Sequence, residues 1–158
     1  MPNLILIIDF GSQYTQLIAR RVRESGVYSV VRSNKINKKE LLELNPTGVI
    51  LSGGPDSITS HKKHQLSKNI LDLKIPILGI CYGMQLITDF FKGKVQASKK
   101  KEFGHSVFEL SKTSKLFHGL KKGQEFNVWM SHSDKVIRLP IGFKSLGCSS
   151  NTKFAAMY

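Results

Sequence analysis

Cys81 stands in a setting that favours chemistry at its thiol. The stretch Gly79-Ile80-Cys81-Tyr82-Gly83 has the form G-x-C-x-G and lies between an apolar run and a helix-like pattern. A strand, a sharp turn and a helix in this order form a nucleophile elbow, which projects the central side chain above the sheet edge. The helix that starts there points N–H groups at the sulfur, which is expected to lower the thiol pKa and favour the thiolate. The pattern therefore predicts a nucleophilic cysteine.

A second glycine turn supports this interpretation. Gly53-Gly54-Pro55-Asp56 ends the preceding apolar run, and carboxyl ends of parallel strands meet at the edge where ligands bind. Backbone N–H groups from this turn and from Tyr82 are therefore candidates for an oxyanion hole. The alternative is that Cys81 is a buried structural residue at a strand end. The two flanking glycines favour the nucleophile.

The second cysteine, Cys148, lacks this context, and we expect it to be structural. Two cysteines with no CxxC or HxxxH spacing cannot complete a four-ligand zinc site, so no metal is expected. Two reduced thiols are typical of a cytoplasmic protein, and no apolar run is long enough to cross a bilayer. We therefore expect a cytoplasmic protein with no membrane partner.

Strand-like and helix-like patterns alternate four times between residues 4 and 91. Such alternation predicts an α/β fold with a doubly wound, mostly parallel sheet flanked by helices. From Lys94 onward the pattern changes to short strands joined by polar turns, which predicts an antiparallel extension in the C-terminal third. One domain, residues 1–158, is expected to contain both parts. The predicted strands cover residues 4–9, 27–31, 48–54, 75–80, 93–98, 105–110, 126–130, 143–149 and 153–158. The first predicted helix follows Ser12, its expected N-cap. The other predicted helices cover residues 38–45, 64–73 and 82–91.

The net charge of +13 raises the alternative of a basic nucleic-acid-binding protein. The basic residues are mostly scattered lysines, whereas arginine is the preferred reader of phosphates and guanine edges. No recognition motif accompanies them. We therefore interpret the charge as a lysine-rich solvated surface and expect no nucleic-acid partner.

Three segments together resemble the class I (triad-type) glutamine amidotransferase domain: GICYGMQ, ILSGGPDS and VWMSHSDKV. The segments IDFGSQYTQLIARRVRESGVY and KEFGH are similar to the GMP synthase branch of that family, and the resemblance runs from Ile7 to Met157. It implies hydrolysis of glutamine to glutamate and ammonia through a cysteine thioester, without a cofactor in this domain. It also implies a partner, an ATP-pyrophosphatase domain or subunit that uses ATP and Mg to convert XMP to GMP.

The resemblance also implies roles for individual residues. Cys81 matches the nucleophile, Gly54 and Tyr82 match the oxyanion hole, and Gly79 and Gly83 match the elbow. Six further residues match segments that hold the glutamine substrate: Gln85, Glu102, Ser131, His132, Ser133 and Asp134. The last four are expected to form one loop.

The family's remaining catalytic pair, in a His-Pro-Glu motif, has no match in this sequence. None of the five histidines begins an H-x-E motif, and no carboxylate follows Asp134. The expectation is a C-terminally incomplete domain with a reactive thiol and impaired turnover, since acid–base catalysis contributes roughly 10²–10⁴-fold in rate. His132, near Asp134, is an alternative base, whereas His61 and His64 stand beside lysines and are expected to be solvated. Two further alternatives are a non-catalytic glutamine-binding or regulatory module and a subunit of another class I amidotransferase.

Overall fold

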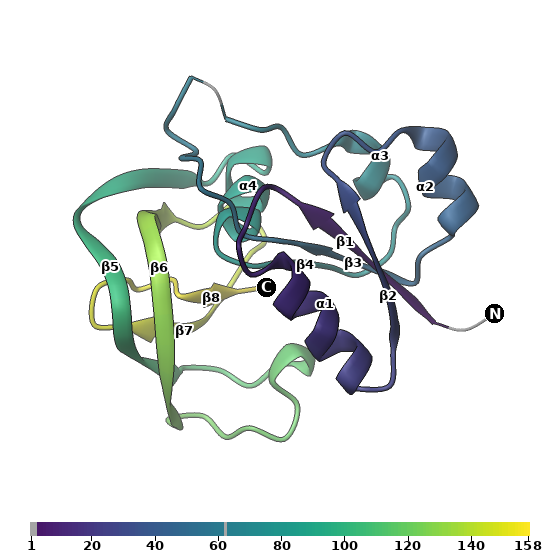
Figure 1. Cartoon of the computed structure of the whole chain (residues 1–158). Helices are drawn as coiled ribbons and strands as arrows, with labels where there is room; N and C mark the ends of the chain where they lie inside the picture. Colours follow the sequence, from purple (N-terminus) through teal and green to yellow (C-terminus); the bar gives the residue numbers. More distant parts are fainter. Residues whose placement is uncertain (1–2, 62) are drawn as a thin grey trace. The chain divides into compact units, whose positions relative to one another are not determined.

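A computed structural model describes residues 3–61 and 63–158 of the chain, with the side chains of residues 99–102 outside that description (Figure 1). The described residues form two compact units. The described residues of the first unit are 3–56 and 63–87. The second unit consists of Ser57–His61 and Thr88–Tyr158. A single domain covering residues 1–158 stays a prediction.

A four-stranded parallel sheet forms the core of the first unit. Its strands are β1 (Leu4–Asp9), β2 (Tyr28–Ser33), β3 (Gly48–Leu51) and β4 (Ile77–Gly79), in the order β2-β1-β3-β4. The side chains of Leu6, Ile7 and Ile8 are 0% exposed. A continuous apolar run of this kind suits a strand that is covered on both faces. The predicted parallel sheet is confirmed.

Each of these strands is followed by a helix, as Figure 1 shows. They are α1 (Thr15–Glu24), α2 (Lys38–Leu44), α3 (Lys68–Leu71) and α4 (Tyr82–Phe90). None of the helices in the described part of the chain is long and apolar enough to cross a membrane. The helix predicted for residues 64–73 is only four residues long, because residues 64–67 are irregular and residues 72–73 form a turn.

The prediction that Ser12 is the N-cap of the first helix was wrong. The N-cap is Tyr14, and the helix begins at Thr15. Ser12 instead forms a serine turn, because its hydroxyl accepts the N–H of Tyr14 at 3.1 Å and its carbonyl accepts the N–H of Thr15 at 3.3 Å. Gly26 follows the C-cap Ser25 with φ +78°, the left-handed conformation in which a glycine commonly ends a helix.

The second unit contains an antiparallel sheet. Its strands are β5 (Lys94–Leu110), β6 (Glu125–Arg138), β7 (Ser145–Ser149) and β8 (Ala156–Met157), in the order β6-β5-β7-β8, with the short 3-10 helix η1 (Lys115–Phe117) between β5 and β6. The predicted antiparallel part is confirmed. Two of the predicted short strands merge into β5, whose pairing with β6 has a register irregularity between Ala97 and Glu102.

Candidate active site

Cys81 has the backbone conformation that a nucleophile elbow requires. Its φ is +52°, in the left-handed region that side chains other than glycine rarely adopt. The residue lies between the last strand of the parallel sheet and Tyr82, the first residue of α4, and its carbonyl accepts the N–H of Gln85 at 3.1 Å. A left-handed residue of this type costs about 1–2 kcal/mol, so the surrounding fold must impose it. The predicted strand–turn–helix is confirmed, and the catalytic role of the thiol stays a prediction.

Gly83 lets the elbow close against the end of β3, and Gly79 lets the end of β4 pack against the first turn of α4. A Cβ atom on Gly83 would lie 2.3 Å from the carbonyl oxygen of Leu51, and one on Gly79 would lie 2.6 Å from the backbone nitrogen of Met84. The N–H of Gly83 also donates to the carbonyl of Ser52 at 3.1 Å. The turn is therefore in direct backbone contact with β3, with no room for a side chain at either glycine.

The second glycine turn lies beside the elbow. A Cβ atom on Gly53 would lie 3.8 Å from the Cβ of Cys81. One on Gly54 would lie 2.8 Å from the carbonyl oxygen of Phe10 and 3.4 Å from the ring of Tyr82. The structure thus brings Cys81, Gly54 and Tyr82 together at the carboxyl end of the parallel sheet. N–H groups in this position suit an oxyanion hole, a role that stays a prediction.

Gln85 is the predicted glutamine-binding residue in this unit. It lies in the first turn of α4 and is only 4% exposed. A buried amide side chain is stable only where it finds hydrogen-bond partners. Its position one turn after Cys81 is compatible with the glutamine-binding role, which stays a prediction.

The polar residues predicted to form a substrate loop lie within a strand, so that prediction was wrong. Residues 131–134 belong to β6, where His132 is opposite Glu102 and Asp134 is opposite Ala97 of β5. Because successive side chains of a strand point to opposite faces, His132 and Asp134 lie on one face of β6. The side chain of Glu102 lies outside the described part of the structure. The glutamine-binding roles of these residues stay predictions.

Asp134 is a buried carboxylate with contacts inside the second unit. The residue is 3% exposed, and its Oδ2 accepts the hydroxyl of Ser57 at 2.5 Å and the N–H of Ile58 at 3.0 Å. Ile58 is itself 5% exposed. Hydrogen bonds to an ionised carboxylate are stronger than neutral ones. Asp134 therefore fixes the segment Ser57–His61 to β6.

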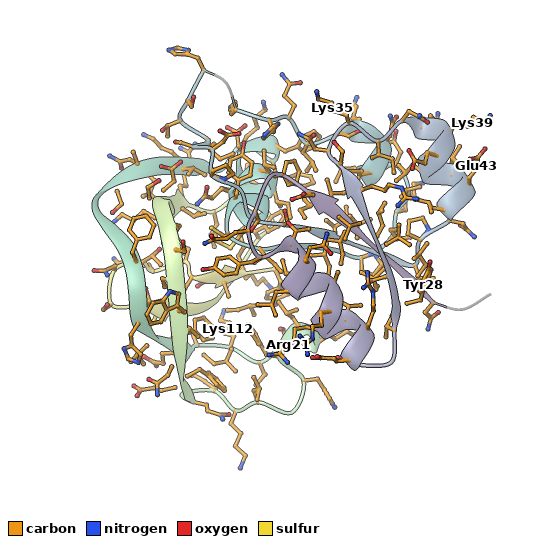
Figure 2. The ribbon with its side chains drawn as sticks, in the orientation of Figure 1. Arg21, Tyr28, Lys35, Lys39, Glu43 and Lys112 are labelled. Atoms are coloured by element: carbon orange, nitrogen blue, oxygen red, sulfur yellow. The ribbon has the colours of Figure 1, made fainter. Side chains whose placement is uncertain are left out.

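Replacing Asp134 by alanine is expected to lower the free energy of unfolding by about 1–3 kcal/mol, because the buried N–H of Ile58 loses its acceptor. Denaturant unfolding followed by circular dichroism measures this change. The control is Glu43→Ala on α2, where the ion pair with Lys39 (3.8 Å) faces solvent (Figure 2). An exposed pair contributes little, so the control should stay within about 0.5 kcal/mol of the unsubstituted chain. Equal losses in the two variants would contradict the role of Asp134.

His64 is part-buried and bonded, so the prediction that it is solvated was wrong. Its Nδ1 lies 2.7 Å from the amide nitrogen of Asn34, and its Nε2 lies 2.9 Å from Oδ2 of Asp56. Its backbone N–H donates to the hydroxyl of Tyr82 at 2.9 Å. No local pattern in the sequence could have indicated these contacts, because the partners lie up to 30 residues away.

Both cysteines are free thiols. Cys148 lies in β7, opposite Glu109 of β5, and its sulfur is 4.0 Å from the hydroxyl of Ser111. Its structural role stays a prediction. Among the side chains that the structure describes, no three from His, Cys, Asp or Glu lie close enough together to hold a metal ion.

Comparisons with known proteins agree with this geometry. Residues 6–158 match the family described as glutamine amidotransferase class-I. Over 155 residues, the chain is 50% identical to GMP synthase [glutamine-hydrolyzing] of Staphylococcus saprophyticus and 44% identical to that of Maridesulfovibrio salexigens. Each alignment covers 98% of this chain and 30% of the relative, so the chain spans about a third of the length of these relatives.

Two solved structures share the fold. A Thermoplasma acidophilum protein whose name assigns it to GMP synthase is 31% identical, with a TM-score of 0.82 over 100% of this chain and 78% of that one. A Thermotoga maritima glutamine amidotransferase is 21% identical, with a TM-score of 0.78 over 100% of this chain and 72% of that one, and supports the fold alone. The resemblance inferred from the motifs is therefore confirmed, and the chain belongs to the class-I glutamine amidotransferase family.

Proposed function

We propose that this chain is the glutamine-hydrolysing part of a GMP synthase. The Cys81 thiolate attacks the side-chain amide carbon of glutamine, the C–N bond breaks, and protonated nitrogen leaves as ammonia. Water then hydrolyses the resulting γ-glutamyl thioester to glutamate and returns the thiol. The observation that carries the proposal is the left-handed conformation of Cys81, at φ +52°, beside the turn of Gly53 and Gly54.

The elbow supports this chemistry in two ways. The strained turn holds the sulfur away from the helix body, so that an amide carbon can approach it. The N–H groups of Gly54 and Tyr82 donate to the oxygen that becomes negatively charged in the tetrahedral intermediate. Removal of one such donor typically costs about 10²–10³-fold in rate. Gln85 is a proposed glutamine-binding residue of the same unit. For Glu102 and residues 131–134, the glutamine-binding role is proposed from the family resemblance alone.

The family's usual general base belongs to the His-Pro-Glu motif, which has no match in residues 1–158. Both ring nitrogens of His64 are already bonded, to Asn34 and Asp56. Oδ2 of Asp134 accepts two hydrogen bonds, which weakens the case for Asp134 as the orienting acid of a His132 base. We therefore expect these 158 residues alone to turn over glutamine more slowly than a protein that carries the His-Pro-Glu motif.

The partner follows from the length of the relatives. Because the chain covers 30% of the Staphylococcus saprophyticus GMP synthase, a further domain or subunit is expected to use the ammonia. We propose an ATP-pyrophosphatase domain or subunit that activates XMP with ATP and Mg and aminates it to GMP, in the cytoplasm. The amidotransferase part itself is proposed to need no cofactor.

A glutamine-like diazoketone is expected to alkylate Cys81 at least about tenfold faster than Cys148, because only the elbow thiol faces an oxyanion-hole turn. Peptide mass mapping over time gives both rates, and iodoacetamide serves as the reagent without glutamine recognition. Excess glutamine should slow the labelling of Cys81 by the diazoketone. Equal rates at the two cysteines would contradict the proposed nucleophile. Selective labelling without glutamate release would instead favour the alternative of a glutamine-binding module.

A further inference from the structure

His64 connects three loops at the carboxyl end of the parallel sheet. Asn34 follows the last residue of β2, Asp56 ends the second glycine turn after β3, and Tyr82 follows Cys81 at the elbow. The imidazole bonds to the first two, and the backbone N–H of His64 bonds to the Tyr82 hydroxyl. His64 itself lies in an irregular segment before α3. One residue without secondary structure of its own is thus bonded to the loops that follow β2, β3 and β4.

The hydrogen-bond pattern assigns a role to each ring nitrogen. An amide nitrogen such as that of Asn34 only donates, so Nδ1 of His64 accepts. Nε2 then carries the proton and donates to the carboxylate of Asp56 at 2.9 Å. A hydrogen bond to an ionised acceptor is stronger than a neutral one. This hydrogen bond therefore holds the Gly53–Asp56 turn in place at Asp56.

The same turn is held at its Gly54 end by packing. The rings of Phe10, Tyr82 and His64 contact one another. The ring centroid of Phe10 lies 5.6 Å from that of His64 and 5.7 Å from that of Tyr82, and the centroids of His64 and Tyr82 are 6.0 Å apart. Gly54 packs on this cluster, since a Cβ there would lie 2.8 Å from the carbonyl oxygen of Phe10. His64 takes part in both restraints, through its ring faces and through its ring nitrogens.

We propose that His64 is a positioning residue that holds the Gly53–Asp56 turn against Tyr82, so that the N–H groups of Gly54 and Tyr82 point at the same oxygen atom. This inference rests on the proposed function, in which those N–H groups form the oxyanion hole. Catalytic groups must be held within about 0.5 Å of their productive geometry, and surrounding hydrogen bonds supply that restraint. His64 does not act on the thiol itself, because both of its ring nitrogens are committed.

Three substitutions separate the parts of this role. His64→Ala removes the ring and both side-chain hydrogen bonds, whereas His64→Phe keeps a ring but loses the bonds. His64→Gln keeps one acceptor for Asn34 and one donor for Asp56. His61→Ala is the matched control, because that neighbouring histidine is exposed. Circular dichroism and thermal unfolding verify that each variant is folded.

Amide hydrogen exchange tests the restraint without any assumption about catalysis. The backbone amide of residue 64 donates to the Tyr82 hydroxyl at 2.9 Å, and that of Phe10 donates at 3.1 Å to the Ser52 hydroxyl, which is bonded to Gly53. The protection of these two amides should fall about tenfold in His64→Ala and in His64→Phe, since loss of one hydrogen bond releases the turn to that degree. The amide of Ile7, inside β1, should not change. His64→Gln should stay within about threefold of the unsubstituted chain, and His61→Ala within about twofold. Unchanged protection of the amides of residue 64 and Phe10 in His64→Ala would overturn the proposal.

Alkylation then tests the consequence for the site. The diazoketone, whose carbonyl needs the oxyanion hole, should label Cys81 about tenfold more slowly in His64→Ala, while iodoacetamide should react at the same rate. Full retention of diazoketone labelling in His64→Ala would also overturn the proposal. If the unsubstituted chain shows no preference for Cys81, the proposed function fails, and the exchange result decides on the positioning role by itself.

Discussion

Replacing Gly83 by alanine is expected to lower the free energy of unfolding by about 3 kcal/mol, at the upper end of the usual cost of overpacking. The added methyl group would lie 2.3 Å from the carbonyl oxygen of Leu51 and 2.7 Å from its Cβ. That oxygen accepts the N–H of Ile80 at 2.9 Å, so β3 cannot move away without breaking a bond to the elbow. Thermal unfolding should show a midpoint lower by roughly 6–12 °C.

Gly53→Ala is the matched control for this substitution. It also adds a methyl group to a glycine beside Cys81, but the nearest atoms would lie 3.4 and 3.7 Å away, on the side chain of Ser12. These are ordinary contacts, so the loss should stay below about 1 kcal/mol. If both variants lose the same stability, close contact between the elbow and β3 is not what requires glycine at residue 83.

The parallel sheet and the elbow could be predicted because their signals are local. The run from Leu4 to Asp9 is apolar without interruption, and G-x-C-x-G combines glycine spacing with a strand and a helix on either side. Each pattern reports on backbone conformation within a few residues. In the structure, the G-x-C-x-G spacing corresponds to a positive φ at Cys81 and to close backbone contacts at Gly79 and Gly83.

The remaining features depend on contacts between distant residues. His64 bonds to Asn34, 30 residues away, and Asp134 bonds to Ser57, 77 residues away. Residues 131–134 were expected to form a loop because they are polar, but β5 supplies backbone partners that place them in a strand. Polarity indicates exposure of a side chain, whereas membership in a strand depends on the neighbouring chain. Such partners cannot be inferred from one sequence without the fold.

Replacing Cys81 by glycine is expected to stabilise the chain by about 0.5–1 kcal/mol while it removes the proposed activity. Glycine adopts a φ of +52° without steric cost, which relieves about 1–2 kcal/mol of strain, and its greater loss of backbone entropy on folding offsets part of this gain. Diazoketone labelling at this position should vanish, and any glutamate release should fall by roughly 10³-fold or more, since the nucleophile is gone. Denaturant unfolding and a glutamate assay measure the two effects.

Lys74→Gly separates strain from chemistry in this prediction. Lys74 is an exposed residue of the same unit with φ +54°, close to that of Cys81. Its replacement should give a similar gain in stability and leave the labelling of Cys81 unchanged. If Lys74→Gly stabilises the chain but Cys81→Gly destabilises it, contacts of the thiol outweigh the strain, as in a structural cysteine. A gain at both positions would mean that the fold tolerates strain at Cys81 because the turn presents the thiol for reaction, the arrangement expected where stability is sacrificed for function.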